Sequence, residues 1–307
     1  MRIAVIGANG QIGSEIVAQA RAAGIEVLPF THAQCDVTDA AAVGAALAGL
    51  QKDDVVVNTA AYHRVDDCQS NAKQAFAVNA CGAFHVAAAA NLLGAAVVYF
   101  SSDYVFDGAK RRPYVESDEP RPLSVYGVSK LAGEMLVSKA NAAHYIIRVA
   151  GVFGLAGSGG KGGNFVETMI ANAKAGESLR VVDDLVMSPT YAVDAAKLLV
   201  ALLQRQAPYG AYHLTNAGQC SWYEFARCIL ELSGLNAPIE AVKMSAWATP
   251  APRPAYSVLG SERLQAIGLR PASWQQGLKR YLASRPVALL AQPKKAQAGI
   301  AAGKLRR

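Results

Sequence analysis

The first thirteen residues constrain the fold more than any other part of the chain. An apolar run, RIAVIG at residues 2–7, leads directly into the glycine-spaced segment GANGQIG at residues 7–13. A helical pattern then runs from Gln11 to Ala23 and stops at Gly24. A buried strand, a tight glycine turn and a helix in this order are typical of the opening unit of a doubly wound α/β sheet.

The same rhythm of strand and helix recurs through the first half of the chain. Further apolar strands are predicted at 25–29, 54–58, 95–100 and 144–149, with helices near 39–49, 71–93 and 125–141. Strands that are apolar throughout are buried on both faces, which is typical of parallel sheets covered by helices. The sequence therefore predicts an α/β protein with a doubly wound parallel Rossmann sheet.

The pattern becomes irregular beyond Arg148. We expect a glycine-rich loop at 154–163, a helix through Ala175, a short strand at 179–184, a helix at about 190–204 and a strand at 211–215 that returns to the sheet. Further helices and proline-rich loops are expected from Ser221 onward.

These elements predict two domains and a tail. The Rossmann domain takes residues 1–150 and about 188–215, and a smaller, discontinuous C-terminal substrate-binding lobe takes about 151–187 and 216–285. Residues 286–307 are alanine-rich and basic without an apolar period, so we expect a mobile tail there.

Composition indicates a globular protein without a nucleic-acid partner. Hydrophobic residues make up 52% of the 307 residues, which is enough for a large core. Much of the net charge of +7 comes from cations without acidic neighbours near the C-terminus, namely Lys294, Lys295, Lys304, Arg306 and Arg307. The rest of the chain is nearly balanced, so we expect no nucleic acid to bind.

The cysteines and the N-terminus favour a reducing cytoplasm. Cys35, Cys68, Cys81, Cys220 and Cys228 form no C-x-x-C pair and no metal-ligand spacing, so neither a disulfide scaffold nor a metal site is expected. The first residues already form a strand, and no uninterrupted apolar run reaches the ~18 residues of a membrane span. We expect neither a secretory signal nor a membrane helix.

The glycine segment at 7–13 predicts a dinucleotide site. Backbone amides at the start of the first helix, together with its dipole, can hold a pyrophosphate. An acidic residue at the tip of the second strand would bind the ribose hydroxyls of NAD, but Thr31 and His32 stand there, so NADP is favoured and NADH stays possible. Asp36 is a candidate for the adenine edge or, equally, for a helix N-cap.

Three side chains predict acid–base chemistry. Tyr126 and Lys130 stand four residues apart in the predicted helix, so they share one face. A free phenol has a pKa of ~10, and a nearby cation stabilises its phenolate. Ser102 lies at the carboxyl end of the apolar strand predicted at 95–100, the edge where open α/β sheets bind ligands. Its hydroxyl can polarise a substrate carbonyl. We predict that Ser102, Tyr126 and Lys130 are catalytic.

Several segments spread over the chain to about residue 282 carry a family resemblance. They are GANGQIG at 7–13, NTAAY at 58–62, SSDYVFDG at 101–108, YGVSKLAGE at 126–134, SPT at 188–190, YHLTNAGQCSWYEFA at 212–226 and RPAYSVL at 253–259. The sequence resembles the extended short-chain dehydrogenase/reductase superfamily and, within it, the dTDP-4-dehydrorhamnose reductase family. SSDYVFDG with YG-x-SK-x-x-GE is the specific part.

The resemblance implies NADPH-dependent reduction of a 4-keto-6-deoxy nucleotide sugar, as in the conversion of dTDP-4-dehydrorhamnose to dTDP-rhamnose in dTDP-rhamnose biosynthesis. Tyr126 would give the proton, Ser102 would orient the keto group and Lys130 would bind ribose. The implied substrate contacts are Ser102, Asp103, Asn164 and Arg253. The full set of predicted cofactor residues is Gly7, Asn9, Gly10, Gln11, Ile12, Gly13, Thr31, His32, Asp36, Val37, Ala60, Ala61, Tyr62, Ser101, Tyr126 and Lys130.

The chain departs from the family pattern at implied substrate contacts. Gly151 stands where a tryptophan is usual, His63-Arg64 replaces a threonine–alanine pair, and Leu185-Val186-Met187 stands where glutamine and glycine are usual. The resemblance therefore implies the chemistry and leaves the exact sugar open, with a less selective pocket expected.

Other functions on the same fold stay open. A nucleotide-sugar epimerase or another 4-ketoreductase would use the same three catalytic residues. The family also resembles a non-catalytic NADP-binding regulatory subunit of methionine adenosyltransferase, against which the intact Ser102, Tyr126 and Lys130 argue. A homodimer is common among the relatives, and the sequence leaves the oligomeric state open.

Overall fold

A six-stranded parallel sheet forms the centre of the computed structural model, which describes residues 1–156 and 163–285. Its strands lie in the order β10-β5-β4-β3-β1-β2, and every pair is parallel. They are β1 (Ile3–Ile6), β2 (Val27–Phe30), β3 (Val55–Asn58), β4 (Ala96–Ser102), β5 (His144–Val149) and β10 (Gly210–His213). The predicted doubly wound sheet is confirmed. The strand order reverses between β1 and β3, the place where such sheets bind ligands.

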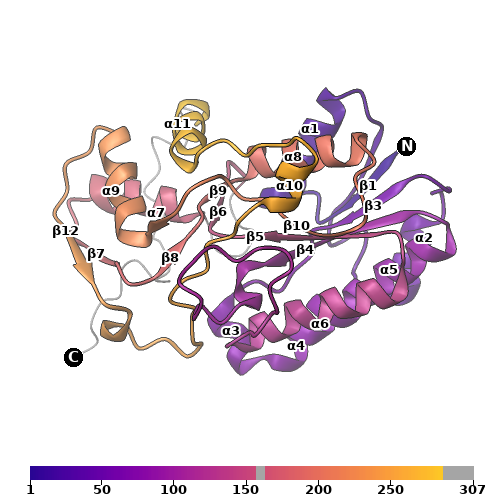
Figure 1. Cartoon of the computed structure of the whole chain (residues 1–307), viewed down its shortest axis with the longest axis horizontal. Helices are drawn as coiled ribbons and strands as arrows, with labels where there is room; N and C mark the ends of the chain where they lie inside the picture. The colour runs from indigo at the N-terminus through magenta and orange to yellow at the C-terminus, as the bar shows by residue number, and fades with distance from the viewer. Residues whose placement is uncertain (157–162, 286–307) are drawn as a thin grey trace.

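Helices cover both faces of this sheet (Figure 1). On one face α1 (Gln11–Ala22) packs beside α8 (Ala192–Gln204), and on the other face α2 (Ala40–Leu47), α5 (Ala83–Leu92) and α6 (Val125–Ala140) lie together. Each face has its own buried cluster, with Ile16, Val57 and Leu199 in one and Val43, Val86 and Val137 in the other. Burial on both faces explains why the strands read as unbroken apolar runs.

The helix predicted at 71–93 is divided by a π-helical turn. It comprises α4 (Ala72–Phe76), the π turn η1 (Ala77–Gly82) and α5, and a short helix α3 (Val65–Ser70) precedes it. The backbone carbonyl of Asn79 in the turn accepts a hydrogen bond from the Tyr99 hydroxyl at 2.6 Å. In a π turn a backbone carbonyl can leave the helical hydrogen-bond pattern and accept from another group. The bond from Tyr99 therefore explains the π turn, which the spacing of apolar residues in the sequence does not indicate.

The helical run 72–92 is the one run in the described residues that is long and apolar enough to cross a membrane by length and composition, with a mean hydropathy of 1.3. Its buried residues, including Ala75, Ala83 and Val86, pack against the sheet and α6. A core helix passes the same test, so this run is weak evidence for a membrane span.

Residues after β5 form a second cluster beside the sheet. The helices α7 (Phe165–Lys174), α9 (Trp222–Leu232) and α11 (Trp274–Ser284) surround packed aromatic rings that include Phe153, Phe225 and Tyr281, which meet in tilted and edge-to-face contacts. Three small sheets pair β7 (Leu179–Val182) with β12 (Ile239–Val242), β8 (Val186–Met187) with β11 (Cys220–Ser221), and β6 (Val152–Phe153) with β9 (Thr190–Tyr191).

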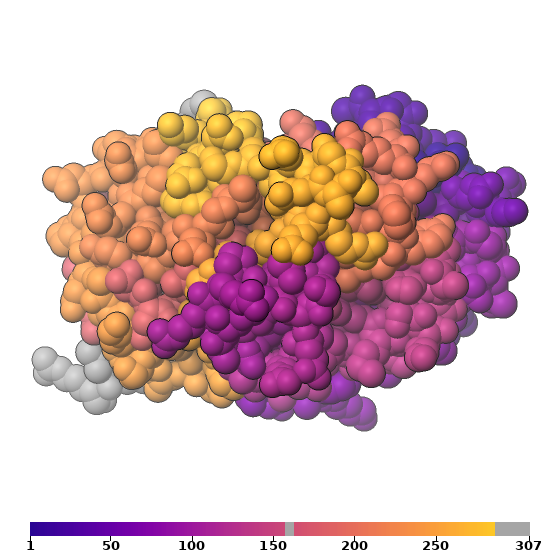
Figure 2. All heavy atoms as spheres, viewed as in Figure 1, coloured from indigo at the N-terminus to yellow at the C-terminus, as the bar shows by residue number. Residues whose placement is uncertain are grey.

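Three short elements remain. They are the 3₁₀ turn η2 (Asp103–Val105), which contacts α6, the 3₁₀ turn η3 (Met244–Ala246), which packs near β7 and β12, and the helix α10 (Glu262–Ala266), which packs on β10. Figure 2 shows the orange and yellow C-terminal residues against the indigo and magenta N-terminal ones. Most of the predicted glycine-rich loop, 157–162, and the predicted tail 286–307 lie outside the described residues.

Candidate active site

The glycine turn after β1 leaves no room for side chains. Gly7 has φ +80°, a conformation that favours glycine, and a Cβ on Gly13 would lie 2.2 Å from the Gly7 carbonyl oxygen. A Cβ on Gly7 would meet Thr59 Oγ1 at 2.6 Å, because the end of β3 packs against the turn. The α1 N-terminus therefore stands open at the switch point, with no acidic residue in its first turn.

The other residues of the predicted phosphate loop are divided between solvent and the core. Asn9 is exposed, Ile12 packs on the core, and the Gln11 side chain donates to the Val152 carbonyl at 2.8 Å. Gln11 therefore also links the first turn to β6, 141 residues later.

The segment after β2 holds itself by local hydrogen bonds. The Thr31 hydroxyl donates to Gln34 Oε1 at 2.9 Å, and His32 is exposed beside it. Asp36 accepts from the backbone and hydroxyl of Thr38, and these bonds lower the pKa of its carboxyl. Val37 is buried against Gly82 in the π turn. Thr31 and His32 follow β2, so no carboxylate stands at these two positions. The NADP prediction depends on that absence.

Asn79 fixes the segment after β3, and sequence reasoning missed this residue. Its Oδ1 accepts from Tyr62 N at 2.8 Å, and its Nδ2 donates to Ser129 Oγ at 2.9 Å. Ala60 N is held by Asn58 Oδ1 at 3.0 Å, and Ala61 is partly buried beside it. Asn79 thus ties the predicted cofactor segment to α6, and only the π turn places it there.

Ser102 and Asp103 lie at the end of β4, as predicted. The Ser102 hydroxyl donates to Asp103 Oδ1 at 2.8 Å and accepts from Tyr104 N at 3.2 Å. The second carboxylate oxygen, Oδ2, accepts from Ser257 Oγ at 2.6 Å. Burial raises the pKa of Asp103 to about 6, and the two hydroxyl bonds partly offset it.

Tyr126 and Lys130 face this strand end from the first turns of α6. Ser124 caps the helix by accepting from Gly127 N at 3.2 Å, and the close approach at Gly127, where a Cβ would lie 2.2 Å from Tyr104 O, draws α6 onto η2. Burial raises the pKa of Tyr126 well above its usual value, and a side-chain hydrogen bond with Ser102 acts in the opposite direction. The phenol is therefore a protonated acid at neutral pH.

Lys130 is buried without a hydrogen-bond partner among the described residues. Its side chain is 1% exposed, and Nζ lies 4.2 Å from the centre of the Tyr99 ring. Burial lowers the pKa of Lys130 to about 7, although the Glu134 carboxylate raises it in part. An ammonium held in this way needs a polar ligand to complete its hydrogen bonds.

These residues fit a nicotinamide dinucleotide. The glycine turn and open α1 N-terminus suit a pyrophosphate, and Lys130 Nζ and the buried Ser101 Oγ are hydrogen-bonding atoms without protein partners in the described part of the chain. Ribose hydroxyls between the turn and α6 would satisfy both.

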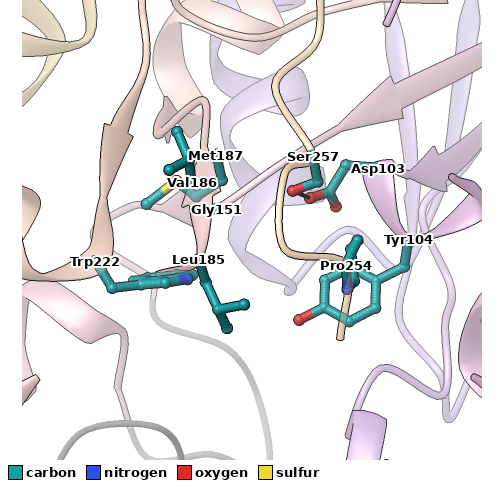
Figure 3. Close-up of a pocket in the computed structure, with 9 residues that line it drawn as sticks. All are labelled: Asp103, Tyr104, Gly151, Leu185, Val186, Met187, Trp222, Pro254 and Ser257. Atoms are coloured by element: carbon teal, nitrogen blue, oxygen red, sulfur yellow. Dashed lines mark hydrogen bonds between the residues drawn. The ribbon is translucent and has the colours of Figure 1, made fainter. Parts of the chain in front are cut away.

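A pocket with one polar and one apolar wall lies at Asp103, the residue after Ser102 (Figure 3). Asp103, Tyr104 and Ser257 lie on the polar side, and Leu185, Met187 and Trp222 face them from the opposite side. Trp222 is the first residue of α9 and does not follow a strand of the Rossmann sheet, where ligand contacts are expected. The sequence alone therefore did not indicate it as a pocket residue.

Met187 accounts for the glycine at 151. Gly151 has φ +50°, and a Cβ there would lie 2.8 Å from the Met187 sulfur. The space beside Gly151 is therefore taken by the thioether from β8, and Trp222 supplies an indole from another direction.

Two predicted substrate residues do not line this pocket. Asn164 caps α7 by accepting from Glu167 N and donates to Gly154 O and Tyr281 OH, so its polar groups serve the second cluster. Arg253 binds Asp66 Oδ2 at 2.8 Å, and its side chain is 3% exposed. Their roles as substrate contacts stay predictions.

A buried ion pair behind the catalytic helix was also missed. Arg148 on β5 donates to both oxygens of Glu134 on α6, at 3.0 and 2.7 Å, and His213 Nε2 lies 3.5 Å from the Arg148 guanidinium. Burial, with Arg148 beside it, lowers the pKa of His213 to about 3. Glu134 follows Lys130 by four residues, which was the available sequence signal.

The fold and this site define a nicotinamide-dependent oxidoreductase of the extended short-chain dehydrogenase/reductase class. The sequence model described as the RmlD substrate binding domain matches residues 1–286. The chain therefore belongs to the dTDP-4-dehydrorhamnose reductase family, a family of sugar-nucleotide reductases.

Relatives match over nearly the whole chain. A spore coat polysaccharide biosynthesis protein of Bacillus subtilis, SpsK, is 40% identical over 284 residues, covering 92% of this chain and 98% of that protein. The dTDP-4-dehydrorhamnose reductase of Mycobacterium tuberculosis is 39% identical over 289 residues, covering 92% and 93%.

Solved structures of the same family superpose closely. A dTDP-4-dehydrorhamnose reductase from Clostridium acetobutylicum is 38% identical with a TM-score of 0.87, covering 92% of this chain and 99% of that one. The enzyme from Bacillus anthracis, in complex with NADP, is 34% identical with a TM-score of 0.86, covering 92% and 98%.

Proposed function

We propose that this protein uses NADPH to reduce the 4-keto group of a 4-keto-6-deoxy nucleotide sugar, with dTDP-4-dehydrorhamnose as the first candidate substrate. The observation that carries the proposal is the meeting of Ser102, Tyr126 and a buried Lys130 beside a two-walled pocket. The relatives named as dTDP-4-dehydrorhamnose reductases, together with the neighbour bound to NADP, support it.

Tyr126 is the proposed proton donor. When bound, NADPH supplies the hydride to the carbonyl carbon. The buried phenol gives its proton to the carbonyl oxygen, and the Ser102 hydroxyl orients that oxygen by hydrogen bonding. Lys130 binds the ribose hydroxyls, and its ammonium lowers the cost of the phenolate that remains.

The proposed cofactor site extends from the glycine turn to the π turn. Backbone amides at Gln11 to Gly13 would hold the pyrophosphate, since the Gly10 amide donates to the Gly7 carbonyl at 2.9 Å, and Ala60 to Tyr62 would line the nicotinamide side. Because Thr31 and His32 offer hydrogen bonds without a carboxylate, the 2′-phosphate of NADP is favoured over the ribose diol of NAD.

The second cluster is the proposed substrate lobe, with the boundaries of 151–187 and 216–285 given above. Asp103, Tyr104 and Ser257 would accept and donate to sugar hydroxyls, while Met187 and Trp222 offer an apolar surface to the deoxy carbon. Met187 fills the space beside Gly151 with a flexible thioether, where the family usually has a rigid tryptophan side chain. We therefore expect tolerance of sugars beyond the rhamnose precursor.

The test is oxidation of NADPH by the whole chain against a panel of dTDP-, UDP- and GDP-linked 4-keto-6-deoxy sugars, with C4 configuration read by NMR. One NADP⁺ formed per sugar reduced supports a reductase, whereas sugar conversion without net NADP⁺ identifies an epimerase. Binding of NADPH with no turnover on any sugar would favour the regulatory-subunit alternative. A tenfold preference for NADH in kcat/KM, about 1.4 kcal/mol, would contradict the cofactor assignment.

We also propose a cytoplasmic homodimer. All five cysteines are thiols, which supports a reducing compartment. The outer sides of α5 and α6 expose four large apolar side chains, Phe84, Leu92, Val128 and Met135. Such a patch on neighbouring helices suits a two-fold interface. Sedimentation equilibrium should give twice the chain mass, and Met135→Lys should shift it to monomer; a monomeric parent protein would refute the dimer.

A further inference from the structure

The carboxyl group of Asp103 is unusual because it is buried without a cation. It is 4% exposed, and its bonds come from two hydroxyls, Ser102 and Ser257. Within residues 1–156 and 163–285, no lysine, arginine or histidine forms an ion pair with it. A buried carboxyl that faces a pocket without a counter-ion suits proton transfer better than structural support.

Hydrogen bonds of Asp103 connect Ser102, the neighbour of the phenol, to the pocket. Ser102 donates to Asp103 Oδ1 at 2.8 Å, and the other oxygen of Asp103 accepts from Ser257 at 2.6 Å. On its other side Ser102 interacts with Tyr126, and this interaction partly offsets the rise that burial causes in the pKa of the phenol. Asp103 and Ser257 both line the pocket, side by side in Figure 3. Water that enters the pocket can therefore reach Asp103 without passing the phenol.

We propose that Asp103 returns the proton to Tyr126 after each reduction, through the Ser102 hydroxyl. The inference rests on the reductase function proposed above. In its acid form Asp103 carries a proton on Oδ1 and donates it to Ser102 Oγ, the reverse of the bond that its carboxylate accepts. Once Tyr126 has given its proton to the sugar oxygen, Ser102 passes its hydroxyl proton to the phenolate oxygen and takes the carboxylic proton of Asp103. A hydronium ion or a buffer acid from the solvent then protonates the Asp103 carboxylate through the pocket, which supplies the one proton that each reduction consumes. Asp103 thus acts as a positioned proton store behind the catalytic tyrosine.

The charges around Asp103 allow this cycle near neutral pH. Tyr104 on η2 and Tyr126 on α6 are the titratable groups facing it, and burial raises the pKa of both. Beyond Tyr104, Arg253 and Asp66 pair with each other at 2.8 Å and act on the pKa of Tyr104 in opposite directions, Arg253 lowering it and Asp66 raising it. Burial raises the pKa of Asp103 to about 6, so the acid form is available below that pH and declines above it.

The first test compares Asp103→Asn with the parent protein in single and multiple turnover. Asp103 also lines the pocket, so both rates are measured at saturating sugar and compared as a ratio. Tyr126 starts each cycle protonated, so steady-state kcat should fall at least ~10-fold more than the single-turnover rate, since a positioned acid contributes ~10²–10⁴-fold. The limb of the kcat–pH profile that declines with rising pH near 6 should disappear, and a separate limb set by Lys130 should stay. Equal losses in single and multiple turnover, or an unchanged profile, would overturn the relay.

Ser257→Ala gives an independent reading if the asparagine variant does not fold. The Ser257 bond lowers the pKa of Asp103, so its loss should move the same limb to higher pH. An unmoved limb would contradict the proposal. Asp107→Asn is the matched control: Asp107 is partly exposed and accepts from Tyr114 and Ala109 through Oδ1, which asparagine retains, so its profile should equal that of the parent. Turnover by the parent protein tests the reductase function separately.

Discussion

At the scale of single residues, the site combines groups whose charged forms are suppressed by burial. Tyr126 is kept protonated, Asp103 is drawn toward its acid form, and Lys130 is held without a hydrogen-bond partner among the described residues. Each arrangement costs folding free energy, and the proposed function explains each by a proton or a ribose hydroxyl that arrives with cofactor and substrate. The residue-level chemistry can therefore be tested by removing one polar group at a time.

Replacing Tyr126 with phenylalanine removes only the ionising oxygen. We expect kcat to fall by ~10²–10⁴-fold, the range for loss of a general acid, with little change in NADPH affinity. Steady-state rates and a fluorescence titration of NADPH measure the two effects. A variant with near-parental kcat would exclude Tyr126 as the donor.

Replacing Lys130 with methionine should stabilise the protein without cofactor. The folded pKa of about 7 lies below the ordinary value of ~10.4, so charging the buried lysine destabilises the fold fully below pH 7, and this cost declines as pH rises toward 10. Melting temperature should therefore rise more at pH 6 than at pH 9, while the stabilisation by NADPH shrinks.

Lys139→Met on the exposed side of the same helix is the control and should change neither quantity. A lower melting temperature for Lys130→Met at pH 6 would show that the ammonium is satisfied in the folded chain.

At the scale of elements, close backbone contacts aim the functional groups. The glycine turn presses α1 against the end of β3, and the contact of Gly127 with Tyr104 O sets α6 on η2. The π turn η1 places Asn79 against three partners: its side-chain amide bonds Tyr62 and Ser129, and its backbone carbonyl accepts from Tyr99. None of these groups is charged, so substitutions at the glycines and at Asn79 should act through geometry rather than charge.

Gly13→Ala should reduce cofactor binding strongly. Its Cβ would lie 2.2 Å from the Gly7 carbonyl oxygen, so the turn or α1 must shift away from the pyrophosphate position. Isothermal titration with NADPH should show at least a ~10-fold weaker Kd, equal to ~1.4 kcal/mol. Unchanged affinity would argue against pyrophosphate binding at this turn.

Gly44→Ala is the control within a helix. No atom lies within 4 Å of a Cβ at Gly44, an exposed position of α2. Alanine there should leave NADPH binding unchanged and stabilise the chain by about 0.5–1 kcal/mol.

At the scale of the whole molecule, the segment 251–260 joins the sheet to the second cluster. It binds Asp66 through Arg253, binds Asp103 through Ser257 and pairs with Tyr114 and Val186 by isolated bridges. The pocket therefore has walls from both halves, and its shape depends on how this segment is fixed (Figure 3).

Asp66→Ala should destabilise the whole chain. It leaves the Arg253 guanidinium, which is 3% exposed, without its carboxylate. The Asp66 side chain is 34% exposed and Arg253 keeps its bond to the Ala251 carbonyl, so we expect a cost of about 2 kcal/mol, below that of a fully buried pair. Urea unfolding measures the change. Asp67→Ala, which breaks an exposed pair with Arg64, should cost below ~1 kcal/mol. Equal effects of the two variants would show that the Arg253 pair contributes no more than a surface contact.

The sequence alone determined what depends on short range. The alternation of apolar strands and helices predicted the parallel sheet, the glycine spacing predicted the turn at α1, and the four-residue step placed Tyr126 and Lys130 on one face of α6. Each of these follows from local period or from a steric rule that acts within a few residues.

Tertiary structure decided the contacts that no local pattern carries. Asp103 meets Ser257 across 154 residues, Arg253 meets Asp66 across 187, and Met187 enters the space beside Gly151. The π turn was also decided by tertiary contacts. The apolar pattern of 71–93 suits an unbroken helix, and the bonds of Asn79 favour the wider turn. Such contacts depend on which distant surfaces pack together, so the polar side of the pocket exists only in the folded chain.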